Sequence, residues 1–362
     1  MTGVTGVIVA LVPAHNEESQ IGTTLTALQS QTRAPDRIVV VTDNCTDRTA
    51  AIAKSIAGVE VFETQGNEHK KAGALNQALA LLLPELNEND VILVQDADSQ
   101  LDRDFVAAGM SELDARPRLG AVGGTFRASA LPEAAPRGAR MLLHLQDNEY
   151  ARYARDVRRL NGRCLVVTGT AAMFRAQTLN AISSARLDGR LPSGDGRGGV
   201  YDTQVLTEDN ELSFAIMHLG FEILAPASMT LKTETMMTWR DLWKQRLRWK
   251  RGAIENCVQY GLTRITWRYW GRQIYTMLGI LVTATYLGSL VWAAFNGGVH
   301  MEGFWLAVTG VFCLERIITL HDKGWLRAIA SGLMYEIPYD LFLQATHAKA
   351  YVDAMTNKRK DW

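Results

Sequence analysis

Residues 91–98 have the sequence Val-Ile-Leu-Val-Gln-Asp-Ala-Asp, an apolar run that ends at two carboxylates separated by one residue. The short aliphatic run at 91–94 predicts a buried strand. Two aspartates at this spacing after a strand can point into one cleft and hold a hard cation such as Mg²⁺ or Mn²⁺. Asp96 and Asp98 are therefore candidate metal-binding residues. Taken alone, the pattern fits a solvated loop at a strand end as well.

Strand and helix patterns alternate on the N-terminal side of this segment. The succession predicts an α/β fold with a mainly parallel sheet flanked by helices. In such sheets ligands bind beyond the carboxyl ends of the strands, so Glu17 and Asp43 are expected beside Asp96 and Asp98. The predicted strands lie at residues 6–13, 37–42 and 59–62, and the predicted helices at 17–29, 46–57 and 71–83.

Several acidic residues have both a functional and a local structural interpretation. Asp43 is a candidate for binding a nucleotide base or ribose, but an Asx turn or a helix cap explains it equally well. Glu17 could simply complement the N-terminus of the first helix. Asp209, in the predicted first turn of a helix after Thr207, could do the same, or it could act as a general base on a hydroxyl, with Glu208 orienting it.

A basic helix is predicted to begin near residue 238, where Thr238 and Asp241 form a capping box. Gln245, Arg248 and Trp249 lie at helical spacing and share one face. An arginine can neutralise a pyrophosphate through bidentate contacts, and a tryptophan offers a flat surface for a sugar ring. The structural alternative is a core tryptophan beside a solvated basic stripe.

The composition excludes several classes of protein. The chain has 362 residues, of which 47% are hydrophobic and 21% charged, and this excludes wholesale disorder. Its net charge is zero, so no overall field attracts nucleic acid. The four cysteines form no CxxC pair, so neither a zinc site nor a disulfide framework is indicated. No GxGxxG follows the first strand, which argues against a dehydrogenase.

The C-terminal third contains apolar runs. Residues 277–295 are nineteen residues without a charge, close to the roughly 20 that span a bilayer. A second run covers 303–314 and 317–320, and basic residues flank the pair on both sides, which predicts a hairpin with both ends in the cytoplasm. A buried core helix is the alternative. Residues 325–352 are expected along the membrane interface, and the Arg-rich stretch 137–163 is expected to face water.

These segments together resemble the family 2 glycosyltransferases with a GT-A fold, in particular the cellulose, chitin and hyaluronan synthase-like branch. The resemblance covers about residues 7–249 and rests on seven motifs in a fixed order. These are Pro13-Ala14-His15-Asn16-Glu17, Asp43, Lys71-Ala72-Gly73-Ala74-Leu75-Asn76, Asp96-Ala97-Asp98, Gly169-Thr170-Ala171 with Arg175, Thr207-Glu208-Asp209, and Gln245-Arg246-Leu247-Arg248-Trp249.

The resemblance implies a role for each matching residue. Asp209 would be the general base of a single inverting displacement, with Glu208 beside it, and Asp98, helped by Asp96, would hold Mg²⁺ or Mn²⁺. The acceptor would be bordered by Gly169, Thr170 and Trp249. The nucleotide-diphosphate sugar would be bound by Pro13, Glu17, Asp43, Lys71, Asp96, Gln245 and Arg248.

The resemblance also implies an organisation and partners. Residues 1–232 would form the catalytic GT-A domain, 233–272 amphipathic interface helices, 273–322 a transmembrane hairpin and 323–362 an interfacial tail. The enzyme would work at the cytoplasmic face of the cell membrane on a carbohydrate, lipid or protein acceptor, with no nucleic-acid partner, and a homo-oligomer is one option for its assembly. The alternatives are a polyprenyl-phosphate or protein glycosyltransferase that adds a single sugar instead of a polysaccharide, and a non-catalytic nucleotide-binding membrane scaffold.

Overall fold

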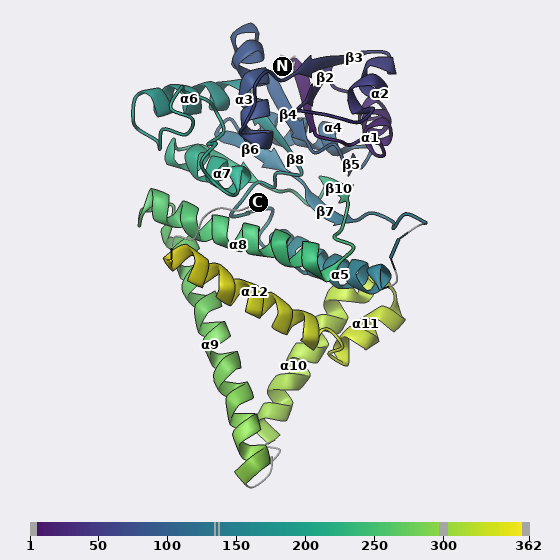
Figure 1. The fold of residues 1–362 in the computed structure, drawn as a ribbon, viewed down its shortest axis with the longest axis vertical. Helices are drawn as coiled ribbons and strands as arrows, with labels where there is room; N and C mark the ends of the chain where they lie inside the picture. Colours follow the sequence, from purple (N-terminus) through teal and green to yellow (C-terminus); the bar gives the residue numbers. More distant parts are fainter. Residues whose placement is uncertain (1–5, 134, 137, 297–302, 357–362) are drawn as a thin grey trace.

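The computed structural model describes residues 6–133, 135–136, 138–296 and 303–356. An α/β layer occupies one end of the molecule, a layer of helices lies beneath it, and two long helices project from the far side (Figure 1). Sequence order follows this arrangement closely, since the helices after residue 238 build most of the lower part.

A seven-stranded sheet forms the centre of the α/β layer, with the order β3-β2-β1-β4-β8-β6-β9. The first four of these strands are parallel, and β8 runs antiparallel between β4 and β6. The mainly parallel sheet is thus confirmed. The strands are β1 (Ile8–Ala14), β2 (Arg37–Thr42), β3 (Val59–Glu63), β4 (Val91–Gln95), β6 (Leu119–Gly123), β8 (Ala171–Arg175) and β9 (Glu222–Leu224).

Helices cover both faces of this sheet because its central strands are apolar on both sides. Ile8 and Val12 of β1 pack with one set of helices, and Val9 and Leu11 with the other, all fully buried. Each such side chain contributes about 1.5–3 kcal/mol. The first set is α1 (Ile21–Gln29), α2 (Thr49–Ser55) and α4 (Phe105–Ala115); the second is α3 (Lys70–Leu82), α6 (Ala176–Leu187) and α7 (Glu208–His218).

Two helices begin later than predicted, for local reasons. α1 begins at Ile21, because residues 17–20 form a turn in which the Glu17 carbonyl accepts from the amide of Gln20. α2 begins at Thr49, because the Asp47 carboxylate accepts from the amide of Thr49 at 2.9 Å and forms the turn that precedes the helix.

A small second sheet adjoins the first. It has the order β5-β10-β7, with β5 at Gln100–Leu101, β10 at Thr230–Thr233 and β7 at Thr125–Ala128. β10 is parallel to β7 and antiparallel to β5. The predicted domain boundary at residue 232 therefore falls at the end of β10.

The lower layer contains α5 (Ala139–Arg159), α8 (Trp239–Tyr260), α11 (Trp325–Gly332) and α12 (Ile337–Met355). α12 packs along α8, and an apolar cluster joins Leu242 and Tyr339 to Leu145 of α5 (Figure 1). The capping box at the start of α8 is confirmed, since the Thr238 hydroxyl accepts from the amide of Asp241 at 3.2 Å. Residues 337–355, predicted as part of a tail, thus form a packed helix.

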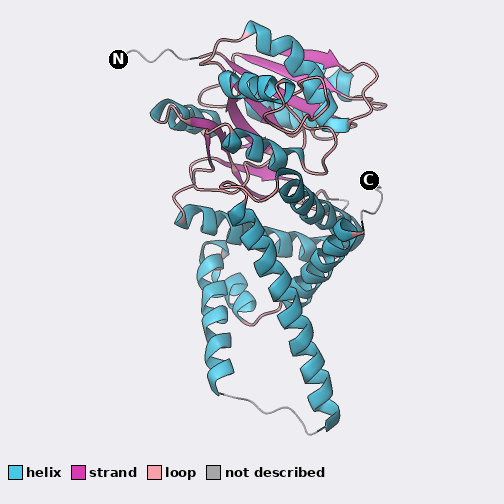
Figure 2. Cartoon of the chain, turned by 90° about the vertical axis from the view of Figure 1, so that its left-hand side faces the viewer, coloured by secondary structure: helices cyan, strands magenta, loops and turns pink. Residues whose placement is uncertain are grey.

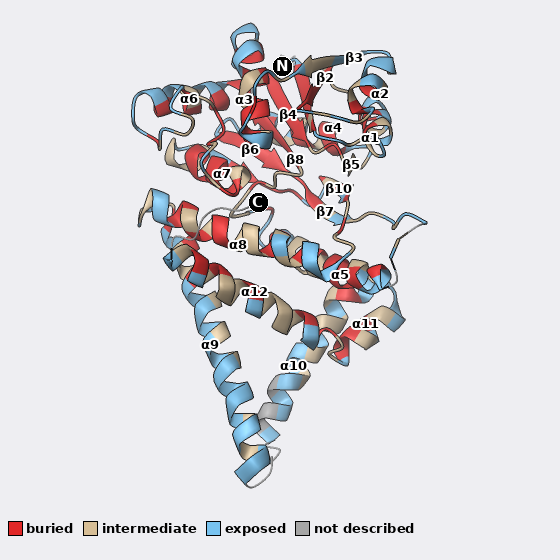
Figure 3. Ribbon diagram, viewed as in Figure 1, coloured by how far each residue is buried: buried red, intermediate tan, exposed pale blue. Residues whose placement is uncertain are grey.

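α9 (Trp267–Asn296) and α10 (Gly303–Leu320) project away from the other helices (Figure 2). Within the described ranges, α9 alone is long and apolar enough to cross a bilayer, by length and composition. Its apolar window is not buried in the protein, and Figure 3 shows the projecting part as exposed. The buried-core alternative is therefore wrong for α9. The predicted boundary at residue 272 lies inside this helix, and residues 297–302 lie outside the described residues.

The Arg-rich stretch 137–163, predicted to face water, does so only in part. Arg140, Arg158, Arg159 and Arg163 are exposed, whereas Arg152 of α5 forms an ion pair with the fully buried Glu336. Glu336 also accepts from Arg316 at 2.8 Å and from the Ser331 hydroxyl at 2.9 Å. A buried carboxylate requires such partners, and here they come from α5, α10 and α11. Glu336 thus ties the C-terminal helices to α5.

We predict that Glu336→Gln lowers the free energy of unfolding by about 3 kcal/mol, because it leaves Arg152 without its buried carboxylate partner and Arg316 with Asp340 alone. Guanidinium unfolding in detergent micelles measures the change. The control is Arg190→Gln, which breaks the exposed Arg190–Asp188 pair and should change stability by less than about 0.5 kcal/mol. Equal effects of the two variants would contradict the role given to Glu336.

Candidate functional site

The carboxyl ends of β1, β2 and β4 lie at one edge of the sheet, as predicted. The amide of Asp43, directly after β2, donates to the Ala14 carbonyl at the end of β1 at 2.9 Å. Because β8 is antiparallel to β4, the residues before β8 reach the same edge. The amide of Asp96 accordingly donates to the Thr170 carbonyl at 2.9 Å.

Asp43 is buried and held by three side chains. Its Oδ1 accepts from Thr64 at 2.7 Å, Asn67 at 2.9 Å and Asn44 at 3.1 Å. Asp43 does not cap α2, which begins six residues later, so the helix-cap interpretation is wrong. Pro13 lies in β1 beside Val41 of β2, one residue before the strand ends.

Glu17 is half-buried in the turn after β1, and its amide donates to the Thr49 hydroxyl at 2.7 Å. Burial, then repulsion from Asp98, Glu234 and Asp96, raises the pKa of Glu17 to about 7. The structure thus brings together the acidic residues predicted from the sequence. Glu234, which follows β10, was not predicted, because no local pattern reveals where a short strand pairs.

The Lys71 ammonium lies between the two groups of candidate residues. It forms an ion pair with Asp96, donates to the Gly169 carbonyl at 2.9 Å, and lies 3.7 Å from Oε1 of Glu208. Burial and repulsion from Asp98 raise the pKa of Asp96 to about 6, although Lys71 opposes the shift. Lys71 thus connects the end of β4 to the start of α7.

Asp209 lies in the first turn of α7, and its carboxylate is held by backbone amides. Oδ2 accepts from Gly169 at 2.9 Å and Oδ1 from Asn210 at 2.7 Å. Burial and repulsion from Glu208 raise its pKa. Thr207 is the N-cap residue as predicted, but its hydroxyl accepts from Asn256 of α8 at 3.2 Å instead of capping α7.

A small cavity lies beside these groups. Its lining includes Lys71, Gly169, Glu208 and Asp209, together with the buried Tyr201. Tyr201 was not predicted from the sequence. Its amide donates to Asn76 Oδ1 at 2.8 Å, which anchors the tyrosine to α3 and so to the motif that begins at Lys71.

The motif on α8 is arranged around a residue that the sequence did not single out. Arg246 is buried and forms an ion pair with Glu149 at 2.9 Å. Its guanidinium donates to Gln245 and lies 4.4 Å from the centroid of the Trp249 ring. Gln245 and Trp249 therefore position Arg246.

The charge of Arg248 acts on the start of α3, since burial and then Arg248 lower the pKa of Lys70. Lys70 has a left-handed backbone, with φ of 51°, and immediately precedes Lys71. Two cationic residues from distant segments are therefore near one another beside the site.

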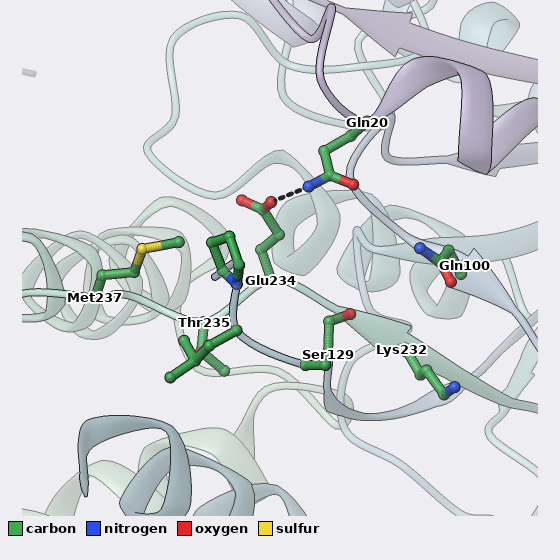
Figure 4. A pocket seen from close by; sticks show the side chains of 10 residues that line it. Gln20, Gln100, Ser129, Lys232, Glu234, Thr235 and Met237 are labelled. Atoms are coloured by element: carbon green, nitrogen blue, oxygen red, sulfur yellow. Dashed lines mark hydrogen bonds between the residues drawn. The ribbon is translucent and has the colours of Figure 1, made fainter. Parts of the chain in front are cut away.

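A second cavity, with a volume of about 240 Å³, adjoins the acidic edge (Figure 4). Gln20 donates to Glu234 across it at 2.6 Å, and Gln100 and Lys232 extend from the small sheet. Amide, hydroxyl and charged groups line it alongside apolar ones.

The acidic residues fit a cation that is bound partly by substrate. Among the described residues, no group of three His, Cys, Asp or Glu side chains surrounds a single point. A Mg²⁺ or Mn²⁺ ion would therefore take Asp96 and Asp98 together with phosphate oxygens and water, which is the usual arrangement for Mg²⁺.

Residues 9–182 match the family model "Glycosyl transferase family 2". The chain contains a family 2 glycosyltransferase domain. The resemblance predicted from the motifs is thus confirmed. The domain is 31% identical to the probable glycosyltransferase YdaM of Bacillus subtilis over 251 residues, covering 67% of this chain and 54% of that protein.

Two further comparisons extend this finding. The family 2 chain is 27% identical to the poly-beta-1,6-N-acetyl-D-glucosamine synthase of Staphylococcus aureus over 299 residues, covering 78% of this chain and 64% of the synthase. It therefore spans between half and two thirds of these relatives. A mannosyltransferase from Pyrobaculum calidifontis, solved with GDP-Man and Mn²⁺, has a TM-score of 0.64 at 18% identity, covering 99% of this chain and 89% of the other. That likeness confirms the predicted GT-A fold.

We predict that Gly169→Ala lowers sugar transfer at least tenfold without unfolding the domain. The added methyl group would meet Oδ2 of Asp209 at 3.2 Å, and Asp209 would shift from its place. Initial rates and thermal melting measure the two effects. Gly271→Ala, where nothing lies within 4 Å of the added atom, is the control. Unchanged rates in Gly169→Ala would show that the position of Asp209 is not critical.

Proposed function

We propose that the protein is a metal-dependent, inverting glycosyltransferase that moves a sugar from a nucleotide-diphosphate sugar to an acceptor hydroxyl at the cytoplasmic face of a membrane. One observation carries the proposal. Lys71 contacts both Asp96 and Gly169, and Gly169 in turn donates to Asp209. A carboxylate of the proposed donor-binding edge, Asp96, and a candidate base, Asp209, are thus held at opposite ends of one short hydrogen-bond network.

The donor would lie along the edge formed by β1, β2 and β4. Pro13, Glu17 and the fixed carboxylate of Asp43 would border the nucleoside. The cations Lys70 and Arg248 would contact the diphosphate, for which arginine is suited by its paired donors. The mannosyltransferase of similar fold binds GDP-Man and Mn²⁺, which supports a nucleotide sugar and a divalent cation here.

Asp96 and Asp98 would hold Mg²⁺ or Mn²⁺, which when bound supplies positive charge against the departing diphosphate. The repulsion between Glu17, Asp96, Asp98 and Glu234 supports this role, because a cation relieves it. Lys71 keeps Asp96 in place and separates its charge from that of Glu208.

Asp209 would be the general base. It would accept the proton of the acceptor hydroxyl while that oxygen bonds to the anomeric carbon and the bond from this carbon to the diphosphate breaks. Burial raises the pKa of Asp209, which brings its proton affinity closer to that suited to catalysis near neutral pH. The amide of Gly169 fixes the carboxylate, and attack opposite the leaving group inverts the anomeric centre.

The acceptor would enter from the side of α8. Gly169, Thr170 and Trp249 would border it, and Gln245 would act through Arg246.

The exposed apolar α9 supports attachment to a membrane, and basic residues before it support a cytoplasmic catalytic domain.

We predict that Asp209→Asn lowers the transfer rate by about a thousandfold, since the amide cannot accept the proton. Donor affinity should change less than twofold, because the donor lies along the other strand ends. Product formation from a radiolabelled donor and equilibrium binding of the nucleotide separate the two. Asp188→Asn, at an exposed position, should be neutral. Turnover near the wild-type rate in Asp209→Asn would reject the base assignment.

We predict that excess chelator abolishes transfer and that Mn²⁺ restores it. In Asp98→Asn the Mn²⁺ concentration for half-maximal activity should rise at least tenfold, because one anionic ligand is lost. Metal titrations of the initial rate test this, with Asp114→Asn, on the exposed side of α4, as the control. Full activity in excess chelator would remove the proposed role of Asp98.

A further inference from the structure

Three helices meet around one lysine on the lower side of α8. The Lys250 ammonium donates to Oε1 of Gln273 on α9 at 2.6 Å and lies 5.1 Å from the ring centroid of Tyr351 on α12. The Tyr351 hydroxyl donates to the same Gln273 oxygen at 2.9 Å and lies 2.8 Å from the Gln273 carbonyl. These contacts fix Lys250 at the junction where α12 packs on both α8 and α9 (Figure 1).

Lys250 and Arg272 form a cationic cluster, and His347 lies near Lys250. Within the described ranges, no carboxylate lies within 4 Å of Lys250 or Arg272. Arg152, Arg186 and Arg246 differ, since each has a carboxylate partner, whereas the buried Arg175 donates to the backbone carbonyls of Leu113 and Leu119. A half-buried ammonium without such a partner is unfavourable unless an anion binds.

The electrostatics of the neighbouring groups agree with this geometry. Burial, then the charge of Arg272, lowers the pKa of Lys250 to about 8. Burial and then Lys250 lower the pKa of His347 to about 4, so His347 is neutral near pH 7 and can donate or accept a hydrogen bond. Arg246 and Arg272 add to that effect, and Glu149 opposes it.

The cationic cluster lies between the candidate base and the membrane-facing part of α9. Lys250 directly follows Trp249. Burial raises the pKa of Tyr153 on α5, and the charges of Arg272 and Asp209 both act on this pKa. On the other side, the uncharged run of α9 starts at Met277, just over one helical turn after Arg272. An anion bound here would be at the level of lipid headgroups.

We propose that Lys250 and Arg272 bind the phosphate of a lipid headgroup, and that the acceptor of this enzyme is a phosphate-bearing lipid whose hydroxyl faces Asp209. The ammonium and the guanidinium, with a neutral His347 nearby, provide the charged and neutral donors that a phosphate requires. A neutral sugar chain would leave the charge of Lys250 uncompensated. This inference rests on the proposed function and specifies its acceptor.

The experiment compares two acceptors that differ in the phosphate. Short-chain dihexanoyl phosphatidylglycerol carries a phosphate diester and free hydroxyls, and dihexanoylglycerol carries a hydroxyl alone. Binding to the full-length protein in detergent is measured by calorimetry, with inorganic phosphate as a third ligand. Transfer is followed with radiolabelled UDP-glucose, UDP-N-acetylglucosamine and GDP-mannose.

We predict that Lys250→Met and Arg272→Gln each weaken phosphatidylglycerol binding at least tenfold, and that Lys250→Arg retains it. Arg268→Gln removes an equal charge one turn away on α9 and should change binding less than twofold. Dihexanoylglycerol should bind all variants equally and weakly, and inorganic phosphate should bind more weakly than the lipid. Melting curves identify any variant that fails to fold, and if Lys250→Met does so, the comparison of Arg272→Gln with Arg268→Gln carries the test.

Three outcomes would overturn the inference. Equal losses in Arg268→Gln and Arg272→Gln would indicate general surface attraction. Phosphate binding as tight as lipid binding would indicate a soluble phosphate ligand. Equal transfer to dihexanoylglycerol would show that the acceptor needs no phosphate, while the proposed glycosyltransferase activity would stand. Conversely, Lys250-dependent lipid binding without transfer to any acceptor would contradict the proposed function and leave the lipid site in place.

Discussion

The arrangement of the site depends on one ammonium group, that of Lys71, which lies among three segments distant in sequence. It neutralises Asp96 at the end of β4, binds the carbonyl of Gly169 before β8, and lies near Glu208 on α7. Without it, two carboxylates would face one another across a partly buried space, which is unfavourable. Because the amide of Gly169 also holds Asp209, the position of the candidate base depends on the same contact.

Much of the fold and half of the site could be predicted because their signals are local. The four parallel strands and the aspartates after β4 come from short apolar runs with polar residues at their ends. Partners that meet only through tertiary packing could not be predicted. Glu234 joins the acidic edge through the pairing of β10, and Glu336 meets Arg152 across 184 residues. The sequence likewise gave no sign that Gln245 and Trp249 both contact Arg246.

Charge is distributed unequally across α8. Above it, Glu17, Asp98 and Glu234 repel one another, and a cation would stabilise them. Below it, Lys250 and Arg272 lack carboxylate partners among the described residues, and an anion would stabilise them. Between the two regions, charges such as Arg246 and Glu149 are paired. A cation at the donor edge and a phosphate near the membrane would therefore complement the same chain from opposite sides of this helix.

The contacts between helices fix how far the site lies from the apolar part of α9. α9 continues without a break from Trp267 to Asn296, so Arg272 and the uncharged run after it keep a fixed separation, about 7.5 Å along the axis between Arg272 and Met277. The contacts of Lys250 with Gln273 and Tyr351 fix α8 against α9 and α12. α7 is joined to α8 through the bonds of Asn256 with Thr207. With α9 in a membrane, as proposed, Asp209 would stand at a defined distance from the lipid surface, a constraint that would serve a membrane-bound acceptor and that a freely diffusing one would not need.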